Sequence, residues 1–246
     1  MPLALRVPFR YDEIRKLTGR AAMPRLFRFG WIEERIERFV FPRCDLIAGA
    51  NEDNMRYALE KGGRPEVATV FRYGNLLHAD HWIEPDGRDN ADADLAGLAL
   101  TGHRFIATVA RLEPMKRVED VVRVVAELFR RGTVVRALIV GDGTLRPQLI
   151  DMARSLGVEH LVVFAGNRNQ ERIARVLPRA SVIVSPHMGR ALVEAGLSGV
   201  PIVAFDYDWQ REVVIDGETG FLVPNGDWLT MADRTESLLG DPETAR

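Results

Sequence analysis

The second half of the chain alternates between short apolar runs and longer amphipathic stretches. The runs have the length of buried strands and cover residues 105–109, 137–140, 162–164, 182–184 and 202–204. Apolar residues recur at helical spacing between them, in residues 118–129, 145–155, 170–177 and 190–197. Strands that are apolar throughout, with helices between them, predict a parallel, doubly wound α/β sheet. Residues 220–223 are expected as an edge strand and residues 228–239 as a last helix.

The first part of the chain shows the same alternation over a shorter length. Strands are expected at residues 3–9, 45–49 and 67–71, and a helix at residues 24–41. Asn51 is expected to cap a second helix that ends at Gly62 and Gly63.

Residues between the two parts have a different composition. The segment 78–103 is rich in Gly, Pro, Asp and Asn, which predicts a linker with a short helix near Leu95. We therefore expect an N-terminal domain over residues 1–77, this linker, and a C-terminal domain over residues 104–246.

Composition and charge disfavour several classes of protein. With 46% apolar and 28% charged residues, the chain has the composition of an ordinary globular protein rather than a disordered one. A net charge of -2 gives no general signal for nucleic acid, and no apolar run reaches the ~18 residues of a membrane span. Cys44 is the sole cysteine, which excludes an internal disulfide and favours a buried structural residue. The first residues lack the order of a secretion signal, so we expect a cytoplasmic protein.

Two polar segments follow strands of the predicted C-terminal sheet. Arg111 and Lys116 lie in the loop after the first strand, and Gly189 opens a helix after the fourth. The carboxyl ends of parallel strands meet at one edge, where ligands bind in such sheets. Fixed cations and the free backbone N–H groups of Gly189 to Leu192 suit a diphosphate, and the carboxylate of Glu194 suits sugar or ribose hydroxyls. The two segments together predict a nucleotide-sugar site.

Six short segments resemble, in this order, the donor domain of family 4 retaining glycosyltransferases, in the glycosyl transferases group 1. They are Ala-Arg-Leu-x3-Lys at 110–116, Ile-Val-Gly-Asp-Gly-x-Leu-Arg at 139–146, Val-Val-Phe-Ala-Gly at 162–166, Ala-Ser-Val-Ile-Val-Ser-Pro at 180–186, Leu-Val-Glu-Ala-Gly-Leu-Ser-Gly-Val-Pro-Ile-Val-Ala at 192–204, and Glu-Val-Val-Ile-Asp-Gly-Glu-Thr-Gly-Phe-Leu-Val-Pro at 212–224. The resemblance implies the GT-B fold, with a complete C-terminal Rossmann-like domain and a partial N-terminal one. It implies retaining transfer of a sugar from a nucleotide diphosphate sugar to a glycan or lipid-linked acceptor, without a metal or another cofactor.

The resemblance also implies roles for individual residues. Arg111 and Lys116 are similar to the pair that holds the donor diphosphate, and Glu194 matches the second glutamate of the Glu-x7-Glu motif, which holds the ribose. These three are the expected catalytic residues, and Gly166 is similar to the backbone that meets the base. The other expected donor-binding residues are Ser185, His187, Gly189, Arg190, Ala191 and Leu192. The leaving phosphate accepts the acceptor's proton in this family, so we expect no side-chain nucleophile.

The sequence departs from the family pattern at one functional position. Pro186 stands eight residues before Glu194, where the family has a glutamate that contacts the transferred sugar. His187 is the nearest polar residue that could replace it, and an exposed loop histidine is the equal alternative. The donor sugar is therefore left open.

The family also has further strands before residue 3 and a final helix that crosses back to the first domain. We therefore expect a truncated chain, lacking part of its N-terminal domain and that helix. One alternative is a non-catalytic nucleotide-sugar-binding subunit or fragment whose missing N-terminal part comes from a partner chain. Another is a nucleotide-sugar epimerase of GT-B fold.

Weaker signals concern a membrane and a metal. Residues 1–43 hold ten Lys or Arg against five Asp or Glu, together with several aromatic residues. Such a segment can lie on the inner face of an anionic membrane, and the alternative is an aromatic core with solvated arginines. His78 and His81 flank Asp80 without a third metal ligand, so solvent exposure is the favoured interpretation. Asp142, between two glycines, has the look of a catalytic residue, and a turn residue favoured for its backbone geometry explains it as well.

Overall fold

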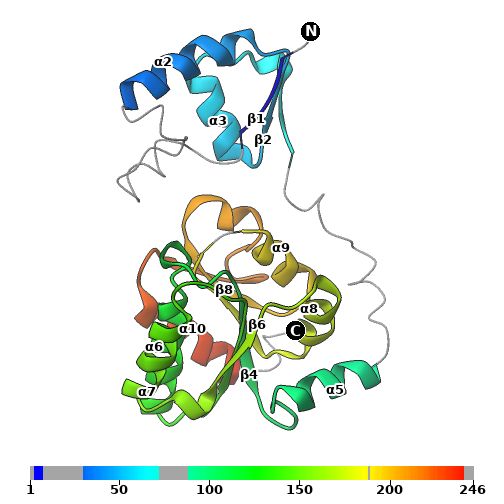
Figure 1. The fold of residues 1–246 in the computed structure, drawn as a ribbon, viewed down its shortest axis with the longest axis vertical. Coiled ribbons are helices and arrows are strands. Elements are labelled where there is room, and N and C mark those ends of the chain that lie inside the picture. Colours follow the sequence, from blue (N-terminus) through cyan, green and yellow to red (C-terminus); the bar gives the residue numbers. More distant parts are fainter. Residues whose placement is uncertain (1–2, 8–29, 72–87, 188, 241–246) are drawn as a thin grey trace. The chain divides into compact units, whose positions relative to one another are not determined.

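The structure is a computed structural model that describes residues 3–7, 30–71, 88–187 and 189–240. The chain divides into two compact units, Met1–Leu76 and Leu77–Arg246. Each unit has its own parallel sheet with helices packed against it (Figure 1). This is the parallel α/β architecture that the apolar runs predict.

The first unit is built on three parallel strands in the order β1 (Ala4–Val7), β2 (Leu46–Gly49) and β3 (Ala68–Val70). Its helices are α2 (Gly30–Val40) and α3 (Glu52–Glu60). The side chain of Asn51 accepts a hydrogen bond of 2.7 Å from the backbone N–H of Asn54, which confirms the predicted cap of α3. Buried side chains of this unit are Val7, Phe41, Cys44, Ile47, Tyr57 and Ala58.

The second unit is built on six parallel strands in the order β6-β5-β4-β7-β8-β9. The strands are β4 (Phe105–Val109), β5 (Arg136–Val140), β6 (Val162–Gly166), β7 (Val182–Ser185), β8 (Ile202–Asp206) and β9 (Gly220–Pro224). The helices between and after them are α6 (Val118–Arg130), α7 (Arg146–Ser155), α8 (Gln170–Val176), α9 (Arg190–Leu197) and α10 (Trp228–Gly240). These elements lie where the sequence pattern predicts them, and β9 is the expected edge strand.

The order of the strands reverses between β4 and β7. From β4 the chain passes outward to β5 and β6, then returns to the other side of β4 to form β7, β8 and β9. Because parallel crossovers are right-handed, the two directions put their helices on opposite faces. Figure 1 accordingly shows α6, α7 and α10 on one face of the sheet and α8 and α9 on the other.

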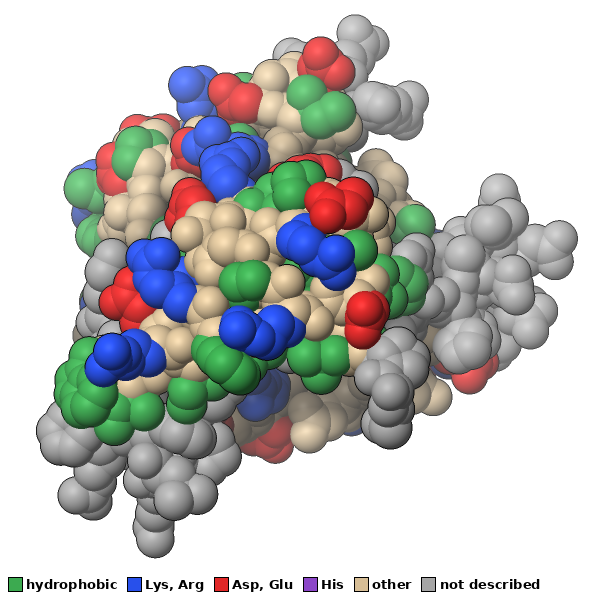
Figure 2. Space-filling model, turned by 90° about the horizontal axis from the view of Figure 1, so that it is seen from above, with side chains coloured by type: hydrophobic (Ala, Val, Ile, Leu, Met, Phe, Trp, Pro, Cys, Tyr) green, Lys and Arg blue, Asp and Glu red, His purple; other side chains and the backbone are tan. Residues whose placement is uncertain are grey.

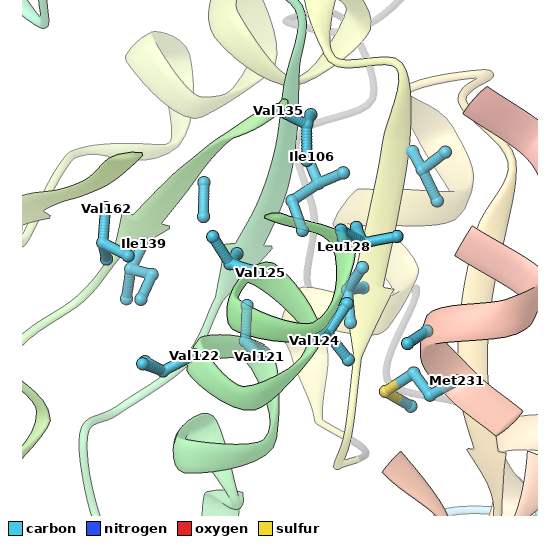
Figure 3. Close-up of a cluster of buried hydrophobic side chains, with 14 of the residues drawn as sticks. Ile106, Val121, Val122, Val124, Val125, Leu128, Val135, Ile139, Val162 and Met231 are labelled. Atoms are coloured by element: carbon cyan, nitrogen blue, oxygen red, sulfur yellow. The ribbon is translucent and has the colours of Figure 1, made fainter. Parts of the chain in front are cut away.

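The core of the second unit lies between α6 and the sheet. Val121, Val125 and Leu128 of α6 pack against strand residues such as Ile106 and Ile139, all of them fully or almost fully buried (Figure 3). Burial of a Val, Leu or Ile side chain contributes about 1.5–3 kcal/mol each. The core therefore makes the second sheet a rigid support for the loops at its edges.

A helix, α5 (Arg88–Gly97), occupies part of the segment between the two predicted domains. Asp94 of α5 is buried and forms ion pairs with Arg172 at 2.7 Å and Arg175 at 3.1 Å, both on α8. This helix is therefore packed on the second unit.

Candidate functional site

The loops after β4 and β7 leave the sheet at the point where the strand order reverses. β4 and β7 are neighbours, with Ile106 opposite Val182 and Ala107 opposite Ile183. Their connections run to helices on opposite faces, and in doubly wound sheets a crevice lies beyond the carboxyl ends of the strands at such a reversal. Ligands of doubly wound sheets bind at such a point. Both predicted motifs lie in these two loops.

The loop after β4 carries the predicted cations. Arg111 is exposed, and Lys116 ends a 3₁₀ turn, Pro114–Lys116. Arg117 follows with φ 52° and ψ 34°, a left-handed conformation that is uncommon for an arginine. Its guanidinium group pairs at 2.7 Å with the fully buried carboxylate of Asp120. The turn that presents Lys116 is thereby fastened to the start of α6.

The loop after β5 supports the loop after β4 through backbone and side-chain contacts. The N–H of Leu112 donates to the carbonyl oxygen of Asp142 at 3.0 Å. Glu113 accepts hydrogen bonds from the backbone N–H of Thr144 at 3.2 Å and from its hydroxyl at 2.9 Å. A Cβ atom on Gly143 would lie 2.5 Å from the carbonyl oxygen of Leu112, so only glycine allows the two backbones to come this close.

Asp142 and Gly166 lie at the ends of neighbouring strands. One carboxylate oxygen of Asp142 accepts a hydrogen bond from the N–H of Gly143 at 2.8 Å, and the other pairs with Arg146 at 3.1 Å. These local contacts agree with the structural interpretation of Asp142. Gly166 ends β6 with φ 68°, a left-handed conformation.

The loop after β7 carries the remaining predicted residues. Ser185 ends the strand, and its hydroxyl donates to the carbonyl oxygen of His187 at 3.4 Å. Gly189, with φ 157°, is the N-cap residue of α9. The N–H of Leu192 donates to the carbonyl oxygen of Gly189 at 2.9 Å, so the prediction that Leu192 has a free N–H group is wrong. The first turn tightens at its cap and uses that donor internally.

The two loops meet at Lys116. Its Nζ atom lies 3.3 Å from Nδ1 of His187, and a Cβ atom built on Gly189 would lie 3.6 Å from the same Nζ. Burial, followed by the positive charge of Arg111, lowers the pKa of Lys116 below its ordinary value. The structure therefore brings together the cation pair and the start of α9, as the sequence predicts, and gathers positive charge in the crevice.

Glu194 lies in the second turn of α9 with 3% of its surface exposed. Its Oε1 atom accepts a hydrogen bond of 3.5 Å from the amide of Gln170, the first residue of α8. Arg190 and Ala191 form the first turn of α9, ahead of this carboxylate. A buried carboxylate behind the start of a helix suits ligand hydroxyl groups.

Two residues of the site carry no signal in the sequence. The aromatic ring of Tyr207 lies 6.1 Å from the ring of His187, centroid to centroid. Gln210 is fully buried and donates from Nε2 to the carbonyl oxygen of Ser185 at 3.0 Å. Both lie after β8, in a stretch whose residue types suggest only a polar turn.

The described part of the chain contains neither a candidate metal site nor a candidate membrane-spanning helix. Among the described residues, no group of three or more His, Cys, Asp or Glu side chains could hold a metal ion. His78, Asp80 and His81 lie outside the described residues. In the same part of the chain, no helix combines the length and the apolar character needed to cross a membrane.

Comparison with known proteins gives the family of the chain. Residues 93–246 match the family described as "Glycosyl transferases group 1". A D-inositol 3-phosphate glycosyltransferase of Nocardia farcinica is 37% identical over 223 residues, which is 85% of this chain and 48% of that protein. A glycogen synthase of Mycobacterium tuberculosis is 31% identical over 150 residues, which is 59% of this chain and 36% of that protein. The chain thus spans about half the length of the first of these relatives.

Solved structures with low sequence identity share the fold. HepE of Anabaena, in complex with UDP-glucose, superposes with a TM-score of 0.80 at 20% identity, over 99% of this chain and 64% of that one. WaaG, a glycosyltransferase involved in lipopolysaccharide biosynthesis, gives 0.75 at 15% identity, over 100% of this chain and 68% of that one. The family match covers more than half of the chain and agrees with this GT-B type fold, so the protein belongs to the glycosyl transferases group 1 family.

Proposed function

We propose that this chain binds a nucleotide diphosphate sugar at the crevice between the loops after β4 and β7, as the donor in a retaining sugar transfer. The observation that carries the proposal is the environment of Lys116, which lies 3.3 Å from His187 and has its pKa lowered by burial and by Arg111. Positive charges gathered in a partly buried place repel one another. A diphosphate bound between them would turn that repulsion into attraction.

The arrangement suggests a role for each part of the site. Arg111, Lys116 and the first backbone N–H groups of α9 would stabilise the charge that builds on the departing diphosphate, which is electrostatic stabilisation of the transition state. Glu194 would hold the ribose, and Gly166 would meet the base. His187, beside Lys116, would face the sugar. No metal or other cofactor enters the proposal, because the fixed cations supply the counter-charge.

Calorimetry with UDP, GDP, ADP and their sugars tests this proposal. At least one nucleotide is expected to bind, and its binding is expected to take up protons at pH values between the lowered pKa of Lys116 and the ordinary 10.5. Proton uptake follows because the diphosphate raises the pKa of that ammonium group. Absence of binding by all three nucleotides at millimolar concentration would contradict the proposal.

The relatives named above are a transferase and a synthase, which favours transfer over epimerisation.

The acceptor side is proposed to involve a membrane surface through α2. Trp31 and Phe39, eight residues apart on this helix, are 62% and 61% exposed, and Arg35 lies exposed between them. Arg43 stacks on the ring of Phe39 at 4.0 Å. Exposed aromatic rings flanked by arginines bind anionic lipid, which would bring the protein to the inner face of the membrane and to a lipid-linked acceptor. Figure 2 shows basic side chains next to hydrophobic ones on the face in view.

Vesicle binding tests the membrane proposal. Trp31→Ala combined with Phe39→Ala is expected to weaken sedimentation with vesicles that contain phosphatidylserine, while Phe129→Ala on α6, 41% exposed, serves as the matched control. Equal sedimentation of all three proteins would contradict it.

A second candidate is a donor-binding subunit whose acceptor site belongs to a partner chain. The chain spans 48% of the length of the Nocardia farcinica relative. Sugar transfer by the purified chain, with only the monomer mass in native mass spectrometry, would contradict this candidate.

A further inference from the structure

Gln210 is a buried polar residue that the proposed chemistry does not use. It lies in the 3₁₀ segment Asp208–Glu212, which follows β8, and none of its surface is exposed. Its Nε2 atom donates to the carbonyl oxygen of Ser185 at 3.0 Å. Its Oε1 atom is buried without a hydrogen-bond partner among the residues that the structure describes. A buried amide oxygen in that state costs stability, and native structures contain few such groups.

The segment that carries Gln210 touches the loop after β7 at two places. Gln210 holds the carbonyl group of Ser185, and the ring of Tyr207 lies against the ring of His187 with 6.1 Å between centroids. The N–H of Gln210 donates to the carbonyl oxygen of Tyr207 at 3.3 Å, which joins the two contacts within one turn. Pro186, between Ser185 and His187, has no N–H group and therefore donates no backbone hydrogen bond.

The contact between His187 and Lys116 depends on where this loop lies. An ammonium group has only donors, so Nδ1 of His187 must accept from Lys116 and the imidazole hydrogen must reside on Nε2. In that tautomer Nε2 carries an N–H donor. A shift of the loop would break the contact and let both tautomers form.

We propose that Gln210 is a positioning residue: by holding the carbonyl group of Ser185, it places His187 against Lys116 and fixes the tautomer that His187 presents to the bound sugar. The effect on the sugar rests on the function proposed above. The effect on His187 does not, because it exists in the protein without ligand.

The first experiment uses the free protein. Gln210→Leu removes the donor, and Gln210→Met does so while keeping the length of the side chain. Thr235→Val on α10 is the matched control, because Thr235 is also fully buried and loses one hydrogen bond, of 2.7 Å to the carbonyl oxygen of Met231. The imidazole ¹⁵N shifts of His187 are expected to show the Nε2–H tautomer in wild type and Thr235→Val. Both Gln210 variants are expected to show a mixture of the two tautomers.

The second experiment measures the affinity for UDP-glucose, with UDP-N-acetylglucosamine and GDP-mannose as alternative probes. Each Gln210 variant is expected to bind the preferred probe about tenfold more weakly, whereas Thr235→Val binds as wild type does.

The outcomes separate the two proposals. If His187 keeps its tautomer in both Gln210 variants, Gln210 does not position the loop. If those signals change as expected but no nucleotide sugar binds to wild type, the proposed function fails and the positioning role stands. Loss of stability equal to that of Thr235→Val, without any change at His187, would make Gln210 a structural residue only.

Discussion

The two loops that meet at the crevice are held in different ways. The loop after β4 is tied to the loop after β5 by backbone bonds, by the carboxylate of Glu113 on Thr144, and by the close approach of Gly143 to Leu112. The described contacts that reach the loop after β7 from the segment after β8 are the amide of Gln210 and the ring of Tyr207. The loop that is proposed to hold the diphosphate is thus tied by backbone contacts, whereas the segment after β8 reaches the loop that is proposed to face the sugar with side chains.

The largest effect is expected from the cation at the meeting point. Lys116→Ala is expected to weaken nucleotide diphosphate binding about 100-fold, because a partly buried ammonium group interacts with phosphate at short range. Calorimetry with the best-binding nucleotide measures it. Arg154→Ala, which removes an exposed cation that is paired with Asp151 and Glu159 on the surface, is the control and should leave affinity unchanged. Equal affinities for both variants would remove Lys116 from the site.

A substitution at Gly143 tests whether the loops after β4 and β5 are locked together. Gly143→Ala would place a Cβ atom 2.5 Å from the carbonyl oxygen of Leu112, so either the loop after β4 or that after β5 must move. We expect a loss of about 2 kcal/mol in the free energy of unfolding, a melting temperature lower by roughly 6 °C, and weaker nucleotide binding. Gly97→Ala, with nothing within 4 Å of the added atom, is the control. A Gly143→Ala protein as stable as Gly97→Ala would show that these loops are not locked together.

The lowered pKa of Lys116 predicts a stability change with a definite sign. The ammonium group of Lys116 holds its proton more tightly in the unfolded chain than in the folded protein. At pH values below the lowered pKa, the positive charge of Lys116 therefore reduces the free energy of unfolding. This penalty disappears as the pH rises from the lowered pKa to 10.5. Lys116→Met is therefore expected to be more stable than wild type in urea near neutral pH, with the advantage shrinking towards pH 10.5. An advantage independent of pH would attribute it to packing.

The smallest effect is expected from the side-chain hydrogen bond between Thr144 and Glu113. Thr144→Val removes the hydroxyl that donates to Glu113 at 2.9 Å but leaves the backbone hydrogen bond to the same carboxylate. Since Thr144 is exposed, the loss is expected to be about 0.5 kcal/mol. A double-mutant cycle with Glu113→Gln in urea unfolding measures the coupling, and a coupling of zero would mean that the backbone contacts alone fix the loop.

The fold could be predicted from the sequence because its strands are continuous apolar runs. The runs that became β4 and β7 have no polar residue except Thr108, and their burial on both faces left few alternatives to a parallel sheet. The start of α3 could be predicted from Asn51 alone, because its side chain accepts a hydrogen bond from the backbone N–H three residues later. Neither inference needed a contact between distant residues.

The site was predictable only where its parts are local. Arg111, Lys116 and Gly189 follow strands directly, so sheet topology alone brings them to one edge. The contact of Gln210 with Ser185 spans 25 residues and depends on how the segment after β8 packs, which no pattern of residue types encodes. The N–H of Leu192 was wrongly expected to be free because the geometry of one helical turn decided it.

The pairing of Arg117 with Asp120 limits the charge that the crevice offers to a ligand. Three basic side chains stand within seven residues of this loop, yet the guanidinium group of Arg117 lies 2.7 Å from a fully buried carboxylate and 5.2 Å from the ring of Phe205. That carboxylate also pairs with Arg123 at 2.6 Å, so two guanidinium groups share its one negative charge. Arg117 is therefore expected to contribute less than an unpaired cation would to the ionic-strength dependence of anion affinity.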